Sequence, residues 1–184
     1  MYDLIVIGTS LGGLHALNVV LGALPAGFQC PIVIVQHRKP DADETLTVLL
    51  QERCHLPVRE AEDKEPLVPG CVYLAPAGYH LLVERGNLAL STEAPVNYAR
   101  PSIDVLFESA ARAYGARVVG VLLTGANADG AQGLGAIKRA GGLTVAQDPA
   151  DVEARTMPEA AIKIGAVDMI LPLEEIGKFL ARIQ

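Results

Sequence analysis

MYDLIVIGTSLGGLHAL, residues 1–17, is the stretch that decides the fold. Its continuously apolar run, Leu4–Ile7, predicts a strand that is buried on both faces. The loop Gly8-Thr9-Ser10-Leu11-Gly12-Gly13 follows, and leucines then recur at helical spacing from Leu14 to Leu24, before Pro25. A strand that turns through glycines into a helix is typical of the first unit of a doubly wound α/β domain.

The alternation of strands and helices continues along the chain. The turn signal Gly86-Asn87 predicts a β-hairpin over His80–Ser91, and the polar segment between Glu60 and Gly70 predicts a loop. We expect one α/β domain over residues 1–184, with a doubly wound, mostly parallel sheet, helices on both faces and an inserted β-hairpin. Further strands are expected at Ile32–Val35, Val72–Ala75, Val118–Leu123 and Leu143–Ala146, and further helices at Glu44–Glu52, 103–114, Asp129–Ala140, Pro158–Ile164 and Leu173–Ile183.

Composition excludes several classes of protein. The formal net charge of −6 argues against nucleic acid as a partner, because phosphate binding needs a basic surface. No stretch approaches the roughly 20 apolar residues of a membrane span, and the N-terminus lacks the features of a signal peptide. Cys30, Cys54 and Cys71 are scattered without metal-ligand spacing. We therefore expect a cytoplasmic protein with reduced, mostly buried thiols, no membrane insertion, no metal and no cofactor.

Chemistry-bearing residues stand just past three of the expected strands. Ser10 follows the first strand, His37 the second, and Asp129 lies in the loop after the strand that ends at Leu123. Ligands and chemistry gather at the carboxyl ends of strands in open parallel sheets. Together the three residues provide a nucleophile, a base and a group that orients the base. We expect Ser10 and His37 within hydrogen-bond reach, and Asp129 on the far imidazole nitrogen.

Other interpretations of the first loop fit less well. A dinucleotide-binding fingerprint needs glycine where Ser10 stands, and an acidic residue where the second strand ends in Gln36 and His37. Gly8-Thr9-Ser10-Leu11-Gly12 satisfies the G-x-S-x-G pattern of α/β-hydrolases, but that fold places its serine after several strands and its histidine last. The order Ser10, His37, Asp129 fits neither a dinucleotide-binding domain nor an α/β-hydrolase.

Each candidate residue also has a structural interpretation. Ser10 is as well suited to cap a helix as to attack a carbonyl, and Asp129 is favoured at the start of its own expected helix by capping alone. Ser102, after Pro101, is a plausible N-cap of the helix over 103–114. A histidine such as His37 is commonly a hydrogen-bonded structural residue. Surface or packing roles are expected for the other three histidines, His15, His55 and His80.

Several segments, in order along nearly the whole chain, resemble the CheB-type protein-glutamate methylesterases of bacterial chemosensory pathways. Gly8–Gly13 resembles the nucleophile loop of that family, and Gln36-His37 its base segment. Arg100-Pro-Ser-Ile-Asp-Val-Leu-Phe107 resembles a helix start of the family, and Leu122–Gly130 the loop with its aspartate. Val72–Pro76, Gln147-Asp148 and Met157-Pro158 also match.

The resemblance implies hydrolysis of methyl esters on glutamate side chains in the cytoplasmic helices of methyl-accepting chemotaxis receptors. It also implies deamidation of receptor glutamines, which is closely related acyl chemistry. Backbone N–H groups of Leu11, Gly12 and Ala126 are candidates for stabilising the oxyanion. Arg100 lies in a family motif and is expected to position the substrate helix or support the catalytic loops, with a structural salt bridge as the alternative.

Three departures from the family pattern affect these expectations. The chain starts at the first strand of the catalytic domain, without the receiver domain that usually precedes it. The usual Thr-Gly-Met-Gly loop is Thr124-Gly125-Ala126-Asn127, and Leu11 replaces a threonine. These departures leave the expected triad unchanged and bear instead on which substrate is chosen and how fast it reacts. The competing hypothesis is a catalytically weak or inactive receptor-binding module of the same fold; the sequence says nothing about oligomeric state.

Overall fold

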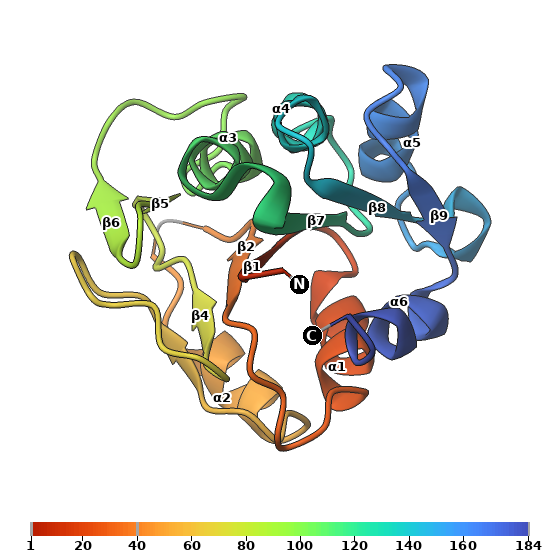
Figure 1. Ribbon diagram of the computed structural model, residues 1–184. Coiled ribbons are helices and arrows are strands. Elements are labelled where there is room, and N and C mark those ends of the chain that lie inside the picture. The colour runs from red at the N-terminus through yellow and green to blue at the C-terminus, as the bar shows by residue number, and fades with distance from the viewer. Residues whose placement is uncertain (1, 40, 184) are drawn as a thin grey trace.

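The computed structural model describes residues 2–39 and 41–183 (Figure 1). Its centre is a seven-stranded sheet with the order β3-β4-β2-β1-β7-β8-β9, in which every neighbouring pair is parallel. The predicted doubly wound α/β class is confirmed. The strands are β1 (Leu4–Thr9), β2 (Ile32–Gln36), β3 (Val58–Glu60), β4 (Val72–Leu74), β7 (Val118–Leu122), β8 (Leu143–Gln147) and β9 (Met169–Leu171).

Helices cover both faces of the sheet, as Figure 1 shows. One face packs against α1 (Gly13–Gly22), α2 (Thr45–Gln51) and α6 (Leu173–Leu180). The other packs against α3 (Ile103–Tyr114) and α4 (Ala131–Arg139), with α5 (Thr156–Lys163) beside α4. The predicted hairpin is present as the antiparallel pair β5 (His80–Val83) and β6 (Leu88–Ser91), and β5 packs on α3. Short 3₁₀ turns occupy Gly115–Arg117 and Pro149–Asp151.

Alternation of side chains along β1 explains the two layers. Leu4 and Val6 point into the core beneath α3 and α4, whereas Ile5 and Ile7 point into the core beneath α1 and α6. All four side chains are fully buried. A strand that is apolar at every position is what two covered faces require.

The strand order creates a crevice at one end of the sheet. From β1 the chain builds outward to β2 on one side, and it later returns to add β7 on the other side of β1. Loops that follow β1 and β7 therefore leave the sheet in opposite directions and separate at their starts. The loop with Ser10 and the loop with Asp129 lie at this switch point.

Two strands and one helix face differ from the prediction. The edge strands β3 and β9 were not expected, because each has three residues, too few to show a periodic pattern. Leu14 is exposed, while Ala16 and Val20 join Leu17 and Leu21 in the core, so the buried face of α1 is rotated from the predicted leucine stripe.

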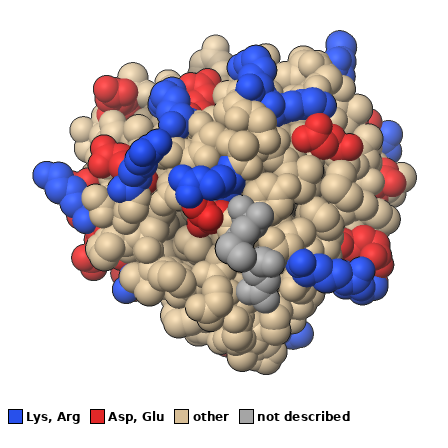
Figure 2. Space-filling model, in the orientation of Figure 1, with Lys and Arg blue, Asp and Glu red and all other residues tan. Residues whose placement is uncertain are grey.

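The surface carries charges of both signs in close proximity. On the face shown in Figure 2, basic and acidic side chains alternate without separating into regions of one sign. Cys30, Cys54 and Cys71 are free and buried, as predicted. Among residues 2–39 and 41–183, no helix is long and apolar enough to span a bilayer, and no cluster of His, Cys, Asp or Glu is suited to a metal ion.

Helices α3 and α4 approach so closely at Gly133 that a side chain has no room. A Cβ atom there would lie 2.6 Å from the Phe107 Cβ and 3.0 Å from the Asp104 Cα. We predict that Gly133→Ala lowers the free energy of unfolding by about 2 kcal/mol, because overpacking outweighs the better helix propensity of alanine. Urea unfolding followed by circular dichroism measures this change.

Gly27→Ala is the matched control, since a Cβ at Gly27 meets no atom within 4 Å. We expect its unfolding free energy to stay within about 0.5 kcal/mol of the wild type. Equal stability of Gly133→Ala and the wild type would contradict this view of the α3–α4 contact.

Candidate active site

The carboxyl ends of β1, β2 and β7 bring Ser10, His37 and Asp129 to one edge of the sheet. In the parallel register Thr9 lies opposite Gln36, which places Ser10 beside His37. The His37 N–H donates to the Thr9 carbonyl at 3.0 Å, which extends the ladder by one bond. Ser10 and His37 face one open cleft of about 920 Å³.

A tight turn presents Ser10. The Gly13 N–H donates to the Ser10 carbonyl at 2.9 Å, and Gly12 has φ 79° and ψ 0°. These angles belong to the third residue of a type II turn, where a residue other than glycine is strained. Gly12, rather than Ser10, occupies the N-cap position of α1, and the helix has no side-chain cap. The helix-cap interpretation of Ser10 is therefore wrong.

Hydrogen bonds join the Ser10 loop to the loop after β7. The Ser10 N–H donates to the Thr124 carbonyl at 2.9 Å, and the Thr124 hydroxyl donates to the Leu11 carbonyl at 2.9 Å. The Gln36 amide donates to the Ser10 carbonyl at 2.9 Å from the opposite side. The N–H groups of Leu11 and Ala126 make no hydrogen bond with any residue that the structure describes. Both are thus available as donors in the two loops that these bonds join.

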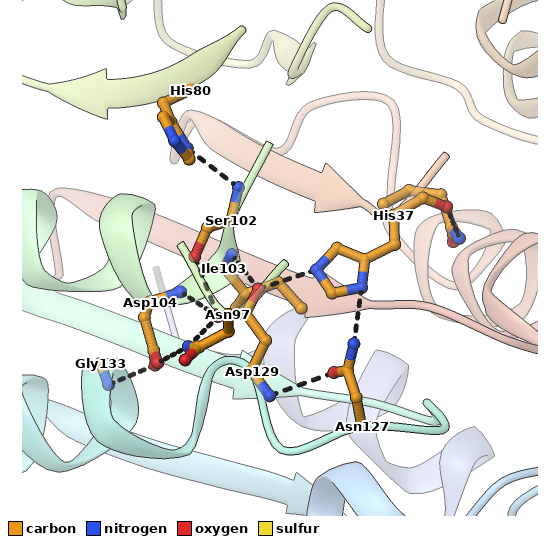
Figure 3. A network of polar contacts seen from close by, with 10 residues as sticks. His37, His80, Asn97, Ser102, Ile103, Asp104, Asn127, Asp129 and Gly133 are labelled. Atoms are coloured by element: carbon orange, nitrogen blue, oxygen red, sulfur yellow. Dashed lines mark hydrogen bonds and ion pairs between the residues drawn. The ribbon is translucent and has the colours of Figure 1, made fainter. Parts of the chain in front are cut away.

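Both ring nitrogens of His37 have hydrogen-bond partners, and the shorter contact is at Nε2. The His37 Nε2 lies 2.7 Å from the Asp129 Oδ2, and since a carboxylate only accepts, Nε2 carries the proton (Figure 3). Nδ1 accepts a longer bond of 3.4 Å from the side-chain amide of Asn127, whose Oδ1 in turn accepts from the Asp129 N–H. The nitrogen with the free electron pair is therefore Nδ1.

The expected hydrogen bond between Ser10 and His37 is not formed. Both residues belong to the described part of the chain, and they share the cleft, but Nδ1 faces Asn127 rather than the serine hydroxyl. Bonds of this kind commonly tighten only when a substrate is bound. The bond on the far nitrogen, to Asp129, is present as expected.

The carboxylate of Asp129 collects donors from the start of α3. Oδ2 accepts from the Ile103 N–H at 2.7 Å, and Oδ1 accepts from the Asp104 N–H at 3.1 Å (Figure 3). Oδ1 also accepts from the Ser102 hydroxyl at 2.9 Å and from the Asn97 amide at 3.2 Å. Asp129 therefore caps α3, not its own helix as the sequence suggested; α4 begins at Ala131 with Gly130 as its N-cap.

Electrostatics keep Asp129 ionised. Burial alone would raise the pKa of its carboxyl group, but the hydrogen bond from His37 and those from the Ile103 and Asp104 N–H groups outweigh burial. The net result is a pKa below the ordinary value of an aspartate. The positive end of the α3 dipole favours the same charged form.

A second buried carboxylate lies next to the first. Asp104 accepts from the Gly133 N–H at 2.7 Å and from the Asn97 amide at 2.8 Å. Burial is the main cause that raises its pKa to about 6; the Gly133 hydrogen bond opposes this rise and the charge of Asp129 adds to it. The neighbouring environments thus drive the two carboxyl pKa values apart.

Comparison with known proteins identifies the family to which the chain belongs. The model of the family described as CheB methylesterase matches residues 5–180. The chain belongs to this family. A crystal structure titled as the CheB methylesterase catalytic domain of Thermotoga maritima superimposes with a TM-score of 0.94, at 34% identity and over 100% of both chains.

Curated relatives of the CheB family agree. A protein of Leptospira interrogans, provisionally named protein-glutamate methylesterase/protein-glutamine glutaminase, is 47% identical over 99% of this chain and 95% of its own length. An Anaeromyxobacter dehalogenans protein-glutamate methylesterase/protein-glutamine glutaminase is also 47% identical, but the match covers 53% of its length. A relative from Caulobacter vibrioides with the same name is 40% identical over 97% of this chain and 53% of its own length.

Several residues of this CheB-family site were missed from the sequence. The buried His80 accepts from the Ser102 N–H at 3.2 Å and bonds the Ala94 carbonyl at 3.0 Å, so it fixes the chain on either side of the Asn97 turn. Ser102 does stand at the N-cap of α3, but its hydroxyl caps nothing and donates to Asp129. Only the family motif around Arg100-Pro101-Ser102 signalled this region; nothing local marks His80 or Asn97.

Arg100 lies at the rim of the CheB-family site. Its Nη1 donates to the carbonyls of Thr92 and Glu93 at 2.9 and 3.0 Å. Within the described residues it forms no ion pair, so the salt-bridge alternative is not what the structure contains. Arg100 braces the segment that leads to the Asn97 turn, and its charge remains uncompensated at the edge of a hollow that His37 also lines.

Protonation of Asp104 makes the stability of this CheB-family chain depend on pH. Its pKa is about 6 when folded, above the unfolded value of 3.8, so the folded state prefers the protonated form. We predict that the wild type gains stability relative to Asp104→Asn as pH falls from about 7.5 through 6 to about 4, by about 1–2 kcal/mol.

Urea unfolding of both proteins across this range measures the difference. Asparagine cannot ionise, and its amide oxygen can still accept from the Gly133 N–H, so the variant serves as a reference that does not titrate at position 104 while the other groups titrate in both proteins. A constant difference over the range would contradict the raised pKa of Asp104.

Proposed function

We propose that this chain is a serine hydrolase that removes methyl esters from glutamate side chains of chemoreceptors. Ser10 is the nucleophile, His37 the general base and Asp129 the group that orients and stabilises the imidazole. The observation that carries the proposal is the 2.7 Å contact between His37 Nε2 and Asp129 Oδ2, inside a buried network that opens onto the cleft with Ser10.

The position of the proton on His37 determines the first step. Because Asp129 holds Nε2–H, Nδ1 takes the proton of the Ser10 hydroxyl as the oxygen attacks the ester carbonyl. A bond forms between Oγ and the carbonyl carbon, and the carbonyl electrons move to its oxygen. The imidazolium that results is stabilised by the ionised Asp129, whose pKa is lowered.

Collapse of the tetrahedral intermediate completes the transfer. The N–H groups of Leu11 and Ala126 support the oxyanion, with Gly12 allowing the turn that exposes the first of them. The protonated Nδ1 gives its proton to the departing methoxy group, which leaves as methanol. Water, deprotonated by Nδ1, then attacks the acyl-Ser10 ester. As the bond between the acyl carbon and Oγ breaks, Nδ1 returns its proton to Oγ, which restores Ser10 and releases the glutamate carboxylate. No metal or cofactor enters this sequence.

Family membership gives the substrate class. The names of the relatives couple methylesterase with glutaminase activity, so we extend the proposal to receptor glutamines, where ammonia leaves instead of methanol. In this proposal the esters and amides lie on cytoplasmic helices of methyl-accepting receptors, and the chain acts in the cytoplasm. Arg100, at the rim, supports the loop that borders the substrate.

The alternative is a receptor-binding module of the same fold that has lost its activity. All three positions of the proposed triad carry residues that can perform their roles: a serine, a histidine and an aspartate. No finding favours the alternative. Such a module would bind methylated receptor yet release no more methanol than a variant without the serine hydroxyl.

Ser10→Ala tests the proposed chemistry. We predict that it lowers methanol release from a methylated receptor fragment by at least about 1,000-fold, because the serine oxygen forms the acyl bond. Gas chromatography of methanol measures the rate.

Gly27→Ala, whose added Cβ meets no atom within 4 Å, is the control and retains the wild-type rate. Equal, low rates in the wild type and Ser10→Ala, with receptor binding retained, would instead support the inactive module.

A further inference from the structure

A fully exposed tyrosine stands beside the proposed active site. Tyr98 is 105% exposed, whereas Val48, the next most exposed of the large apolar side chains in the described residues, is 60% exposed. Exposure of an aromatic ring in water stabilises nothing within the chain. Its position therefore has to be explained by something other than folding.

The backbone that carries Tyr98 is held firmly in a costly conformation. Val96 and Ala99 exchange two backbone hydrogen bonds of 3.1 and 2.9 Å around Asn97 and Tyr98, whose φ angles are 51° and 62°. Positive φ at both central residues is typical of a type I′ turn. Asparagine tolerates this region, but a tyrosine is strained in it. Strain of this kind collects at functional sites.

The turn is fixed directly to the catalytic network. The Asn97 amide donates to Asp104 at 2.8 Å and to Asp129 at 3.2 Å, so the Asn97 side chain points inward (Figure 3). The side chain of Tyr98, by contrast, is fully exposed. Tyr98 therefore sits on a hydrogen-bonded turn, next to Asn97, which donates to the proposed catalytic carboxylate of Asp129. A rigid aromatic loses little entropy on contact with a partner.

Tyr98 lines two hollows. One of about 270 Å³ also contains His37, Arg38 and Arg100, and the other, of about 360 Å³, contains Asp129 and Ile164. A glutamyl side chain is short, so the polypeptide that carries an ester to Ser10 lies close to the mouth of the cleft. His37 lines both that cleft and the hollow that Tyr98 and Arg100 line. Among the described residues, Arg100 donates to carbonyl groups and forms no ion pair, which leaves a positive charge for acidic neighbours of the ester.

We propose that Tyr98 is a specificity-determining anchor that packs its ring against the acidic, glutamate-bearing helix of the substrate protein. This inference rests on the proposed function and deepens it. The ring provides affinity for the polypeptide and takes no part in the chemistry at Ser10. Aromatic side chains held at the centre of an interface commonly supply much of the binding energy.

Steady-state kinetics on a methylated receptor fragment test the proposal. We expect Tyr98→Ala to lower kcat/KM by about tenfold or more, chiefly through a higher KM, as expected for loss of an aromatic anchor. Tyr98→Phe keeps the ring and stays within about twofold of the wild type. Ile170→Ala, which truncates an exposed side chain on the edge strand β9, is the matched control and leaves the kinetics unchanged.

Covalent labelling of Ser10 by a small alkyl fluorophosphonate provides the second readout. The probe needs no polypeptide contact, so Tyr98→Ala and the wild type are expected to label at equal rates. Unchanged receptor kinetics in Tyr98→Ala would overturn the proposal, and so would a parallel loss of labelling, because that loss indicates a structural role.

Failure of the proposed function gives a different pattern. A wild type that releases no methanol from any receptor fragment refutes the esterase function and, with it, the anchor. A wild type that demethylates the receptor at the same rate as Tyr98→Ala refutes the anchor alone.

Discussion

The buried carboxylate of Asp129 is the interaction on which the site depends. Removing a carboxylate from water is costly unless its oxygens are paired. Here they accept from His37, from the N–H groups of Ile103 and Asp104, and from the side chains of Ser102 and Asn97. Three separate segments of the chain therefore meet at one charge: the loop after β2, the start of α3 and the Asn97 turn. The charge that orients the imidazole also fixes the helix and the rim.

Two further constraints place this carboxylate where it is useful. The order of the strands opens the sheet between β1 and β7, so the Ser10 and Asp129 loops face each other across the switch point. Thr124 then joins the loops through hydrogen bonds to Ser10 and Leu11. Burial raises the pKa of Asp104, the second carboxyl group beside Asp129. At low pH Asp104 is therefore neutral, and two negative charges do not stand next to each other. Asn97 donates to both groups and so links them to the exposed Tyr98.

The sequence predicts the sheet and the proposed triad positions because both leave local patterns. Strands that are apolar throughout mark a parallel sheet, and Ser10, His37 and Asp129 stand where such strands end. The residues that support them leave no such pattern. His80 reaches Ser102 across 22 positions and Asn97 reaches Asp129 across 32, and neither pairing follows from periodicity. An aspartate before a helix predicts that it caps that helix. Tertiary packing instead brings the start of α3 to Asp129, so Asp129 accepts from α3 and not from α4. Nor did any pattern show that Asn127 would occupy the nitrogen of His37 that was expected to face Ser10.

The buried negative charge of Asp129 keeps the proton of the His37 ring on Nε2 and leaves Nδ1 unprotonated. Nitrogen-15 NMR of histidine-labelled protein, recorded above about pH 8 where imidazole rings are ordinarily neutral, reads this directly. The signal that disappears in His37→Gln belongs to this ring. We expect a protonated Nε2 and an unprotonated Nδ1 for this ring. A proton on Nδ1, or equal averaging between the two nitrogens, would contradict the account.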